Sequence, residues 1–176
     1  MALDEVGASE VSTSSYISSS LLGSYDQTND MRFKRYFGKV GGDYVSRKGG
    51  NNRYNVSFRN GELYLIIAEA SARAGQKQQA IDALGTLLKN RLPAAALATQ
   101  LAQLAAMDNT ALPAFVMAER KRELALEGLR WYDLKRTDRP QIIHSIAAKE
   151  SILQQNDPRY IIRYPQQAID ANPDLL

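Results

Sequence analysis

Arg59-Asn-Gly-Glu-Leu-Tyr-Leu-Ile-Ile-Ala-Glu-Ala70 opens the stretch of sequence that decides the fold. Apolar residues recur here at intervals of three and four, which is the spacing of one face of a helix, and Gly75 favours a turn before a second such series. We therefore expect a helical hairpin of about 32 residues, close to one tetratricopeptide unit. The expected buried faces are Leu63, Ile66, Ile67, Ala70 and Ala74 in the first helix, and Ala80, Ile81, Leu84, Leu87 and Leu88 in the second.

More helices are predicted downstream of this hairpin. Residues 94–107 are rich in Ala, Leu and Gln, and the next helix should open after Asn109-Thr110 with Pro113 in its first turn and reach Gly128. Residues 131–136 and 141–153 are also expected to be helical, whereas the Pro-rich tail from residue 157 should be extended. A single helix pair cannot bury its apolar face alone, so we expect neighbouring helices from outside this chain.

Upstream of residue 59 the composition is different. Residues 1–20 are polar and rich in Ser and Thr, which predicts a loop with one short helix near residues 18–22. Residues 33–58 contain many aromatic and β-branched residues, interrupted by Gly41-Gly42 and by residues 48–52, so a small β-hairpin arm is expected. The predicted fold class is mainly α, with a small β-hairpin arm and an extended C-terminal tail.

Composition excludes several classes of function. The chain has 176 residues, 44% of them hydrophobic, and its 22 basic against 19 acidic residues give a net charge of only +3, too little for a nucleic-acid surface. It has no cysteine, which excludes zinc ribbons and thiol catalysis. There is no apolar run of about 20 residues and no signal peptide at the start. We expect no cofactor and no metal, and His144, the one histidine, is interpreted as a surface or packing residue.

The densest charged feature lies between residues 119 and 136. On a helix, Glu119, Glu123 and Glu127 would share one face, because they are spaced four residues apart. Two of them could form a carboxylate pair for glycoside hydrolysis or bind a metal. Paired charges on a partly buried helix are the favoured interpretation, with three arginines in reach: Arg120, Arg122 and Arg130.

Three smaller sets of residues are further candidates for a functional site. Arg59, Glu62 and Glu69 are interpreted as a lock that ties the first helix of the hairpin to the 119–136 segment rather than as catalytic groups. Asp26, Asn29 and Asp30 lack the spacing of a calcium-binding loop. They are interpreted as helix-capping and turn residues. Aromatic residues of the arm could stack on sugar rings, although packing is their commoner role: Tyr36, Phe37, Tyr44 and Tyr54.

Two motifs together resemble the SusD/RagB family. The first is Arg59-x-x-Glu-x-Tyr-Leu-x-x-Ala-Glu-Ala70, followed by Gly75 and Ala80. The second is Glu119-Arg-x-Arg-Glu-Leu-x-x-Glu-Gly-x-Arg-x-x-Asp-Leu-x-Arg136. Tyr25, Asp30 and Arg32 are similar to a third region of that family, and the tail over residues 164–173 is similar to its closing segment, with Gln166 and Ala168 as departures. The similarity covers most of residues 20–175.

The resemblance implies a non-catalytic nutrient-binding protein. Members of that family are surface lipoproteins of the Gram-negative outer membrane that capture oligosaccharides or other nutrients above a SusC-like TonB-dependent porin. The resemblance further implies that residues 1–176 form the C-terminal domain of a longer protein, whose lipid anchor lies outside this chain. The ligand contacts expected from the arm are Tyr44, Tyr54 and Tyr36. Two alternatives stay open: a tetratricopeptide-like scaffold that binds a protein partner, and a glycoside hydrolase that uses Glu119 and Glu123.

Overall fold

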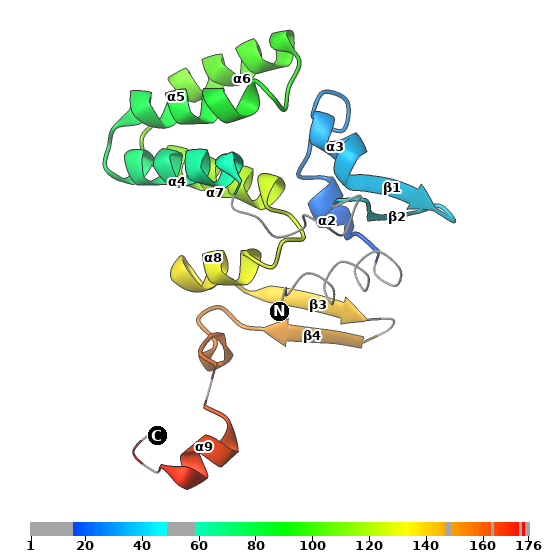
Figure 1. Cartoon of the computed structure of the whole chain (residues 1–176), viewed down its shortest axis with the longest axis vertical. Coiled ribbons are helices and arrows are strands. Elements are labelled where there is room, and N and C mark those ends of the chain that lie inside the picture. The colour runs from blue at the N-terminus through cyan, green and yellow to red at the C-terminus, as the bar shows by residue number, and fades with distance from the viewer. Residues whose placement is uncertain (1–15, 49–58, 147–148, 163, 173, 175–176) are drawn as a thin grey trace. The chain divides into compact units, whose positions relative to one another are not determined.

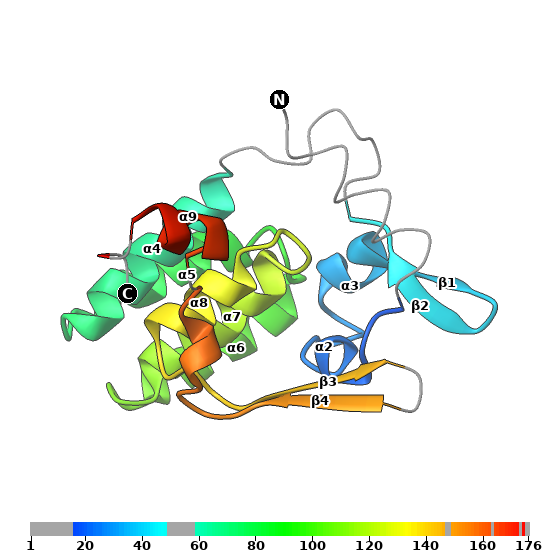
Figure 2. The same ribbon diagram turned by 90° about the horizontal axis from the view of Figure 1, so that it is seen from below.

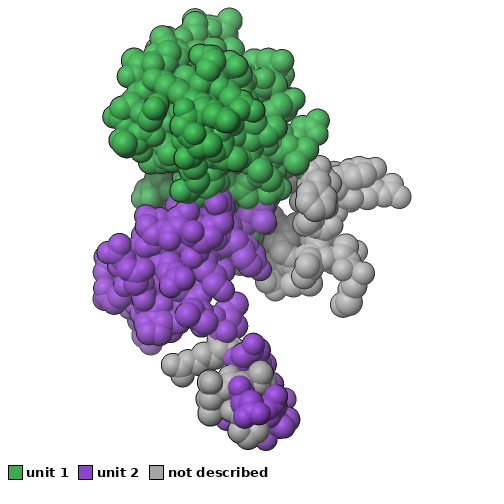
Figure 3. Space-filling view, turned by 90° about the vertical axis from the view of Figure 1, so that its left-hand side faces the viewer, with its two compact units in different colours: residues 1–128 green, residues 129–176 purple. Residues whose placement is uncertain are grey.

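A computed structural model describes residues 16–48, 59–146, 149–162, 164–172 and 174 of the chain. The chain forms two compact units, residues 1–128 and residues 129–176 (Figure 3). The predicted fold class is confirmed, since the described residues are mainly helical and contain a small antiparallel hairpin arm (Figure 1). Tyr54 and the first fifteen residues lie outside the described part of the chain.

Four helices form the larger part of the first unit: α4 (Asn60–Arg73), α5 (Lys77–Leu88), α6 (Ala94–Ala106) and α7 (Leu112–Glu123). Helix α4 packs against both α5 and α7, and α6 packs against α5 (Figure 1). The chain leaves α4 at Gly75, whose φ of +74° suits glycine and allows the tight turn into α5. The predicted helical hairpin, its turn and the place of Pro113 in the first turn of α7 are confirmed.

The apolar core between α4 and α5 agrees with the sequence prediction on one helix only. All five predicted core residues of α5 are buried. The predicted face of α4 is wrong, because Leu63, Ile66 and Ile67 are exposed and the buried face carries Leu65, Ala68 and Ala72 instead. Helix α4 has apolar residues on two faces, and the face with alanines allows close approach of the neighbouring helices. Ala70 and Ala74 of the predicted face are also exposed.

Helix α6 depends on a side chain from α5 at its carboxyl end. It has no charged residue of its own between Ala94 and Ala106. The Lys77 ammonium donates hydrogen bonds to the carbonyl oxygens of Ala105 and Met107. A cation at this end of a helix satisfies carbonyl groups that have no partner within the helix and opposes the negative end of the helix dipole.

The arm precedes these helices and consists of α2 (Ser19–Leu22), α3 (Met31–Tyr36), β1 (Phe37–Val40) and β2 (Asp43–Ser46), as Figure 2 shows. The Asp30 carboxylate caps α3 by accepting a hydrogen bond from the amide of Arg32. The strands are antiparallel, with Phe37 opposite Ser46, and Gly41-Gly42 joins them with both φ angles positive. Two such residues form the tight turn that matches the twist of a hairpin. The predicted β-hairpin is confirmed. Phe33 and Tyr36, which were assigned to the β-arm from the sequence, lie on helix α3 instead.

An aromatic cluster attaches the hairpin to α3 and to the preceding chain. Tyr25, Phe33 and Phe37 are buried, and their rings meet edge to face with centroids 5.3–6.3 Å apart. Tyr36 and Tyr44 pack at the margin of this cluster. Edge-to-face contacts of this kind add to the free energy of burial, so the arm has a small core of its own.

The second unit contains α8 (Arg130–Arg136), β3 (Ile142–Ile146), β4 (Lys149–Leu153), a 3-10 turn (Pro158–Tyr160) and α9 (Gln166–Ala171). The helix predicted over residues 141–153 is wrong, because these residues form an antiparallel hairpin with Ile143 opposite Ile152. β-Branched isoleucines favour strands, which explains the difference. The tail contains the 3-10 turn and α9 where extended chain was expected. Tyr160 is buried and stacks on Trp131 with ring centroids 5.0 Å apart.

Helix α7 ends earlier than the sequence indicated. It stops at Glu123 rather than near Gly128, and the following turn contains two residues with positive φ, Leu126 at +67° and Gly128 at +75°. Glu127 therefore lies in this turn and not on the helix. Among the described residues, every helix is too short or too polar to span a bilayer.

Candidate functional site

A buried group of charges joins the arm to α7. Arg32 of α3 is 2% exposed, and its guanidinium lies 2.7 Å from the Asp30 carboxylate, 2.6 Å from that of Glu119 and 2.9 Å from that of Glu123. Burial opposes the charge of Arg32, but the surrounding carboxylates outweigh it and raise its pKa above the usual value. We call Arg32, Asp30, Glu119 and Glu123 the ion junction.

Glu123 is the most heavily engaged carboxylate of the ion junction. Besides Arg32 it accepts hydrogen bonds of 2.9 and 2.7 Å from Arg91, and Arg59 lies 3.6 Å away. Burial alone would raise the pKa of Glu123, but the guanidinium groups of Arg91 and Arg32 lower it to about 2. Gly61 at the start of α4 makes room for this side chain, because a Cβ there would lie 2.8 Å from Glu123 Oε1.

The ion junction has the character of a structural group rather than a catalytic one. Both oxygens of Glu119 accept hydrogen bonds, from Arg32 and Arg122, and both oxygens of Glu123 are also bonded. The two carboxylates are 1% and 0% exposed, so a sugar ring cannot reach them. Within the described residues no group of three His, Asp or Glu side chains is arranged to hold a metal. The interpretation of these glutamates as charge-paired and partly buried is confirmed.

The predicted lock between α4 and the 119–136 segment is present. Arg59 forms an ion pair with Glu127, and Glu62 pairs with Arg120 at 2.9 Å. Glu69 pairs with Arg73 of its own helix at 2.9 Å. The first motif thus encodes long-range pairing for Arg59 and Glu62.

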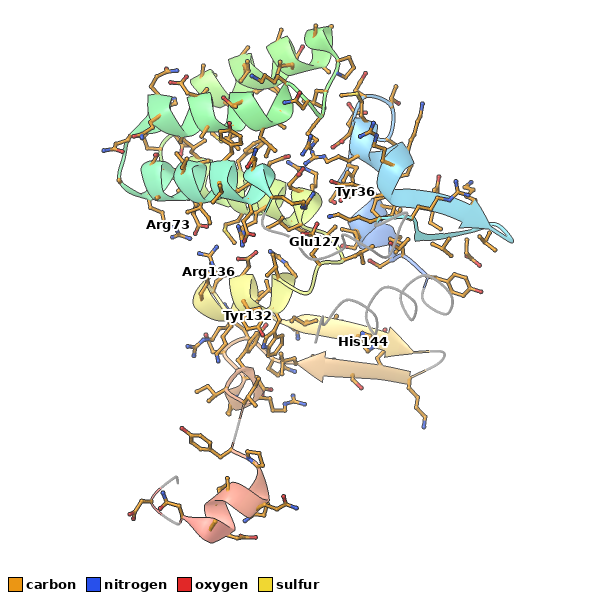
Figure 4. The ribbon with its side chains drawn as sticks, in the orientation of Figure 1. Tyr36, Arg73, Glu127, Tyr132, Arg136 and His144 are labelled. Atoms are coloured by element: carbon orange, nitrogen blue, oxygen red, sulfur yellow. The ribbon has the colours of Figure 1, made fainter. Side chains whose placement is uncertain are left out.

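Lys48 also binds Glu127, the partner of Arg59 in the lock. The sequence analysis did not predict this contact. Its ammonium lies 2.6 Å from Glu127 Oε1 and donates to the carbonyl oxygens of Glu123 and Ala125 at 2.7 and 2.8 Å. It also lies 4.3 Å from the centre of the Tyr36 ring. Burial lowers the pKa of Lys48 to about 8 despite the nearby Glu127 carboxylate. Figure 4 shows Tyr36 and Glu127 on the facing sides of the arm and the helices.

Two of the three predicted ligand contacts are described, and both rings already have neighbours. Tyr36 and Tyr44 are half-buried. The Tyr36 ring has Lys48 above it and Phe37 at 6.3 Å, while Tyr44 packs 5.5 Å from Phe33 and has the Lys39 ammonium 5.1 Å from its centre. Both tyrosines lie at the margin of the same aromatic cluster, and each retains a partly exposed surface.

The remaining polar candidates have local roles. Asp26 accepts hydrogen bonds from the amides of Thr28 and Asn29 and from the Asn29 side chain, which makes it a turn residue. These bonds lower its pKa. His144 is exposed on β3, opposite Ser151 (Figure 4).

Sequence comparison assigns this architecture to a family. The family profile described as the SusD family matches residues 11–176, which is nearly the whole chain. The chain belongs to the SusD family. The motifs that support the lock and the ion junction are therefore features of a SusD-family chain.

One SusD-family relative extends the comparison to a named protein. "SusD-like protein P38" of Formosa agariphila is 34% identical to this chain over 85 residues. The match covers 48% of the present chain but 17% of the relative. This SusD-family chain thus matches less than a fifth of the length of that protein.

Proposed function

We propose that this chain is the C-terminal portion of a non-catalytic SusD-family protein that binds oligosaccharides or related nutrients at the cell surface and delivers them to a SusC-like TonB-dependent porin. The observation that carries the proposal is the family match over residues 11–176, since proteins of that family bind nutrients beside such a porin. The outer membrane is the proposed location, reached through a lipid anchor.

The proposed binding mode is stacking of sugar rings on aromatic side chains of the arm, with hydrogen bonds from nearby polar groups. Tyr44, Tyr36 and Tyr54 are the proposed contacts. Support comes from the positions of Tyr36 on α3 and Tyr44 on β2, both at the margin of the aromatic cluster of the arm that the ion junction joins to the helices. The buried state of Glu119 and Glu123 supports binding without hydrolysis, because a glycosidase needs two carboxyl groups that flank the glycosidic bond.

The test measures oligosaccharide affinity in variants of the arm, by calorimetry on the full-length protein. Tyr44→Ala combined with Tyr54→Ala should weaken binding at least about tenfold if two stacking contacts are lost. Tyr44→Phe should retain most of the affinity, because the ring remains. Tyr132→Ala removes a tyrosine that is 64% exposed in the second unit and serves as the control. Unchanged affinity in the double variant would contradict the proposed contacts.

The alternative function is a tetratricopeptide-like scaffold that binds a protein. The exposed face of α4 favours it, since Leu63, Ile66 and Ile67 are 52%, 50% and 43% exposed. Co-purification of the full-length protein with a SusC-like porin, together with retention of the protein on glycan affinity gels, supports the nutrient receptor. The scaffold is supported if glycan affinity gels do not retain the protein and if it binds a soluble protein partner instead. Ile66→Glu should then abolish binding of that partner.

A further inference from the structure

The arm carries an excess of positive charge. Residues 31–48 contain six basic residues and one acid, Asp43. Arg32 and Lys48 are paired with carboxylates of α7 and of the turn that follows it. The other four basic residues are exposed, and none of them forms an ion pair within the part of the chain that the structure describes: Lys34, Arg35, Lys39 and Arg47. The arm therefore presents an uncompensated positive surface to solvent.

One of these exposed cations, Lys39, lies beside Tyr44, which is a proposed sugar contact. The two residues stand opposite each other in the β1–β2 pair, so their side chains share one face of the hairpin. The Lys39 ammonium lies over the Tyr44 ring, 5.1 Å from its centre, which is a cation–π contact. Asp43 points to the opposite face, because side chains alternate along a strand. The face on which a sugar would stack thus carries a cation, and the acid of the arm lies on the other side.

The charge of a bound sugar decides whether this cation helps or hinders binding. A neutral sugar that stacks on the Tyr44 ring displaces the Lys39 ammonium and offers it hydroxyl oxygens in return. A sugar with a carboxylate or sulfate group offers the same ammonium an anionic acceptor beside the ring. The ammonium binds the anionic acceptor more strongly, because Coulomb attraction adds to the hydrogen bond. The pair therefore favours acidic sugars over neutral ones.

We propose that Lys39 and Tyr44 form a subsite for acidic sugars, in which the Tyr44 ring stacks on the sugar and the Lys39 ammonium binds its carboxylate or sulfate. This inference rests on the proposed nutrient-binding function and adds the substrate class, namely oligosaccharides that contain uronic acids or sulfated sugars. Lys34, Arg35 and Arg47 attract such a ligand from a distance, since the net charge of the arm is felt before contact is made.

The experiment compares retention of the full-length protein on affinity gels of matched polysaccharides. Galacturonan is paired with its methyl ester, chondroitin sulfate with its desulfated form, and starch and xylan are the neutral references. The expected result is retention by at least one acidic polysaccharide and weaker retention by its neutralised form. Retention by neutral polysaccharides that equals or exceeds that by acidic ones overturns the acidic subsite and leaves the proposed nutrient-binding function standing. Retention by none of the gels contradicts the proposed function itself.

Two lysine variants decide whether Lys39 is responsible. Calorimetry with oligosaccharides of the best-retained acidic polysaccharide should show that Lys39→Met weakens binding at least about fivefold, whereas affinity for the neutralised form should stay the same or rise. Lys34→Met is the matched control, because it removes the same charge from an exposed position on α3, and it should weaken binding less than about twofold. Equal losses in the two variants, or equally tight binding of inorganic polyphosphate, would show charge attraction without a subsite and overturn the proposal.

Discussion

The α4–α5 interface and the ion junction are both buried in the first unit, but they are built from opposite chemistry. In the interface, α4 with its buried Leu65 and Ala68 packs against α5, whose apolar face is buried. The ion junction buries Arg32 among three carboxylates at distances of 2.6–2.9 Å. Apolar burial has no direction and weakens gradually as atoms are removed, whereas a buried charge depends on every partner. The interface should therefore tolerate change better than the junction.

Removal of the central cation should produce the largest effect. Arg32→Met leaves Asp30, Glu119 and Glu123 close together without their shared counter-ion, and breaking a buried ion group in this way costs about 4 kcal/mol. Urea denaturation of the whole chain at pH 7 measures the change in the free energy of unfolding. Resonances of the arm should also lose dispersion, because Arg32 links α3 to α7.

An exposed arginine is the control for this prediction. The side chain of Arg73 is 52% exposed and pairs with Glu69 on the same helix, so Arg73→Met should change stability by no more than about 0.5 kcal/mol. Equal effects of the two substitutions would show that the junction contributes no more than a surface ion pair, and the contrast drawn above would fail.

Two leucines of α4 sharpen the comparison from the apolar side. Leu65 is 0% exposed and Leu63 is 52% exposed. Leu65→Ala should therefore cost about 3 kcal/mol through lost burial and the cavity left behind, and Leu63→Ala less than about 0.5 kcal/mol. Thermal and urea unfolding of the two variants measure the difference. If Leu63→Ala were more destabilising than Leu65→Ala, the buried face of α4 would be the one that the sequence spacing predicted.

Acid should weaken the ion junction and leave the apolar interface intact. The pKa of Glu123 lies at about 2 in the folded chain against an ordinary 4.5, so its contribution is complete above about pH 4.5. That contribution, about 3 kcal/mol, is lost as the pH falls from 4.5 towards 2. The free energy of unfolding measured across this range should decrease with a slope that Glu123→Gln reduces. A steeper loss in Glu123→Gln would contradict the assignment.

Substitution by alanine should change stability differently at a glycine beside the ion junction and at a glycine in an apolar helix contact. A Cβ on Gly61 would lie 2.8 Å from Glu123 Oε1, whereas a Cβ on Gly85 of α5 would meet Leu101 Cδ2 at 3.4 Å. Gly61→Ala should thus destabilise the chain by about 1 kcal/mol. Gly85→Ala should be neutral or stabilising by up to about 1 kcal/mol, as expected for alanine in a helix. Paired thermal melts distinguish the two, and stabilisation by Gly61→Ala would show that Glu123 moves aside readily.

The same contrast explains which parts of the fold could be predicted. Helix α5 has a single apolar face, so spacing alone identified its buried residues. Helix α4 has apolar residues on two faces, and only the packing of its neighbours decides which one is covered. Residues 141–153 were misassigned because a short apolar run fits both a helix and a strand, and pairing between Ile143 and Ile152 settled the matter.

Prediction of the charged pairs depended on whether the residues belong to a sequence motif. Pairing of Glu119 and Glu123 with arginines was expected, and the lock from Arg59 and Glu62 to the 119–136 segment was found. Lys48 and Arg91 were missed, because neither belongs to a sequence motif that indicates its glutamate partner. The ligand contacts proposed at Tyr44, Tyr36 and Tyr54 remain predictions.

The lysine cap on α6 has a consequence for the order of folding. Helix α6 contains no internal charge pair, and an isolated helix of 13 residues is marginal in water. Its carboxyl end is completed by Lys77, the first residue of α5. Helix α5 must therefore be in place before α6 gains its full stability, and substitutions in α6 should accelerate unfolding while leaving the refolding rate almost unchanged.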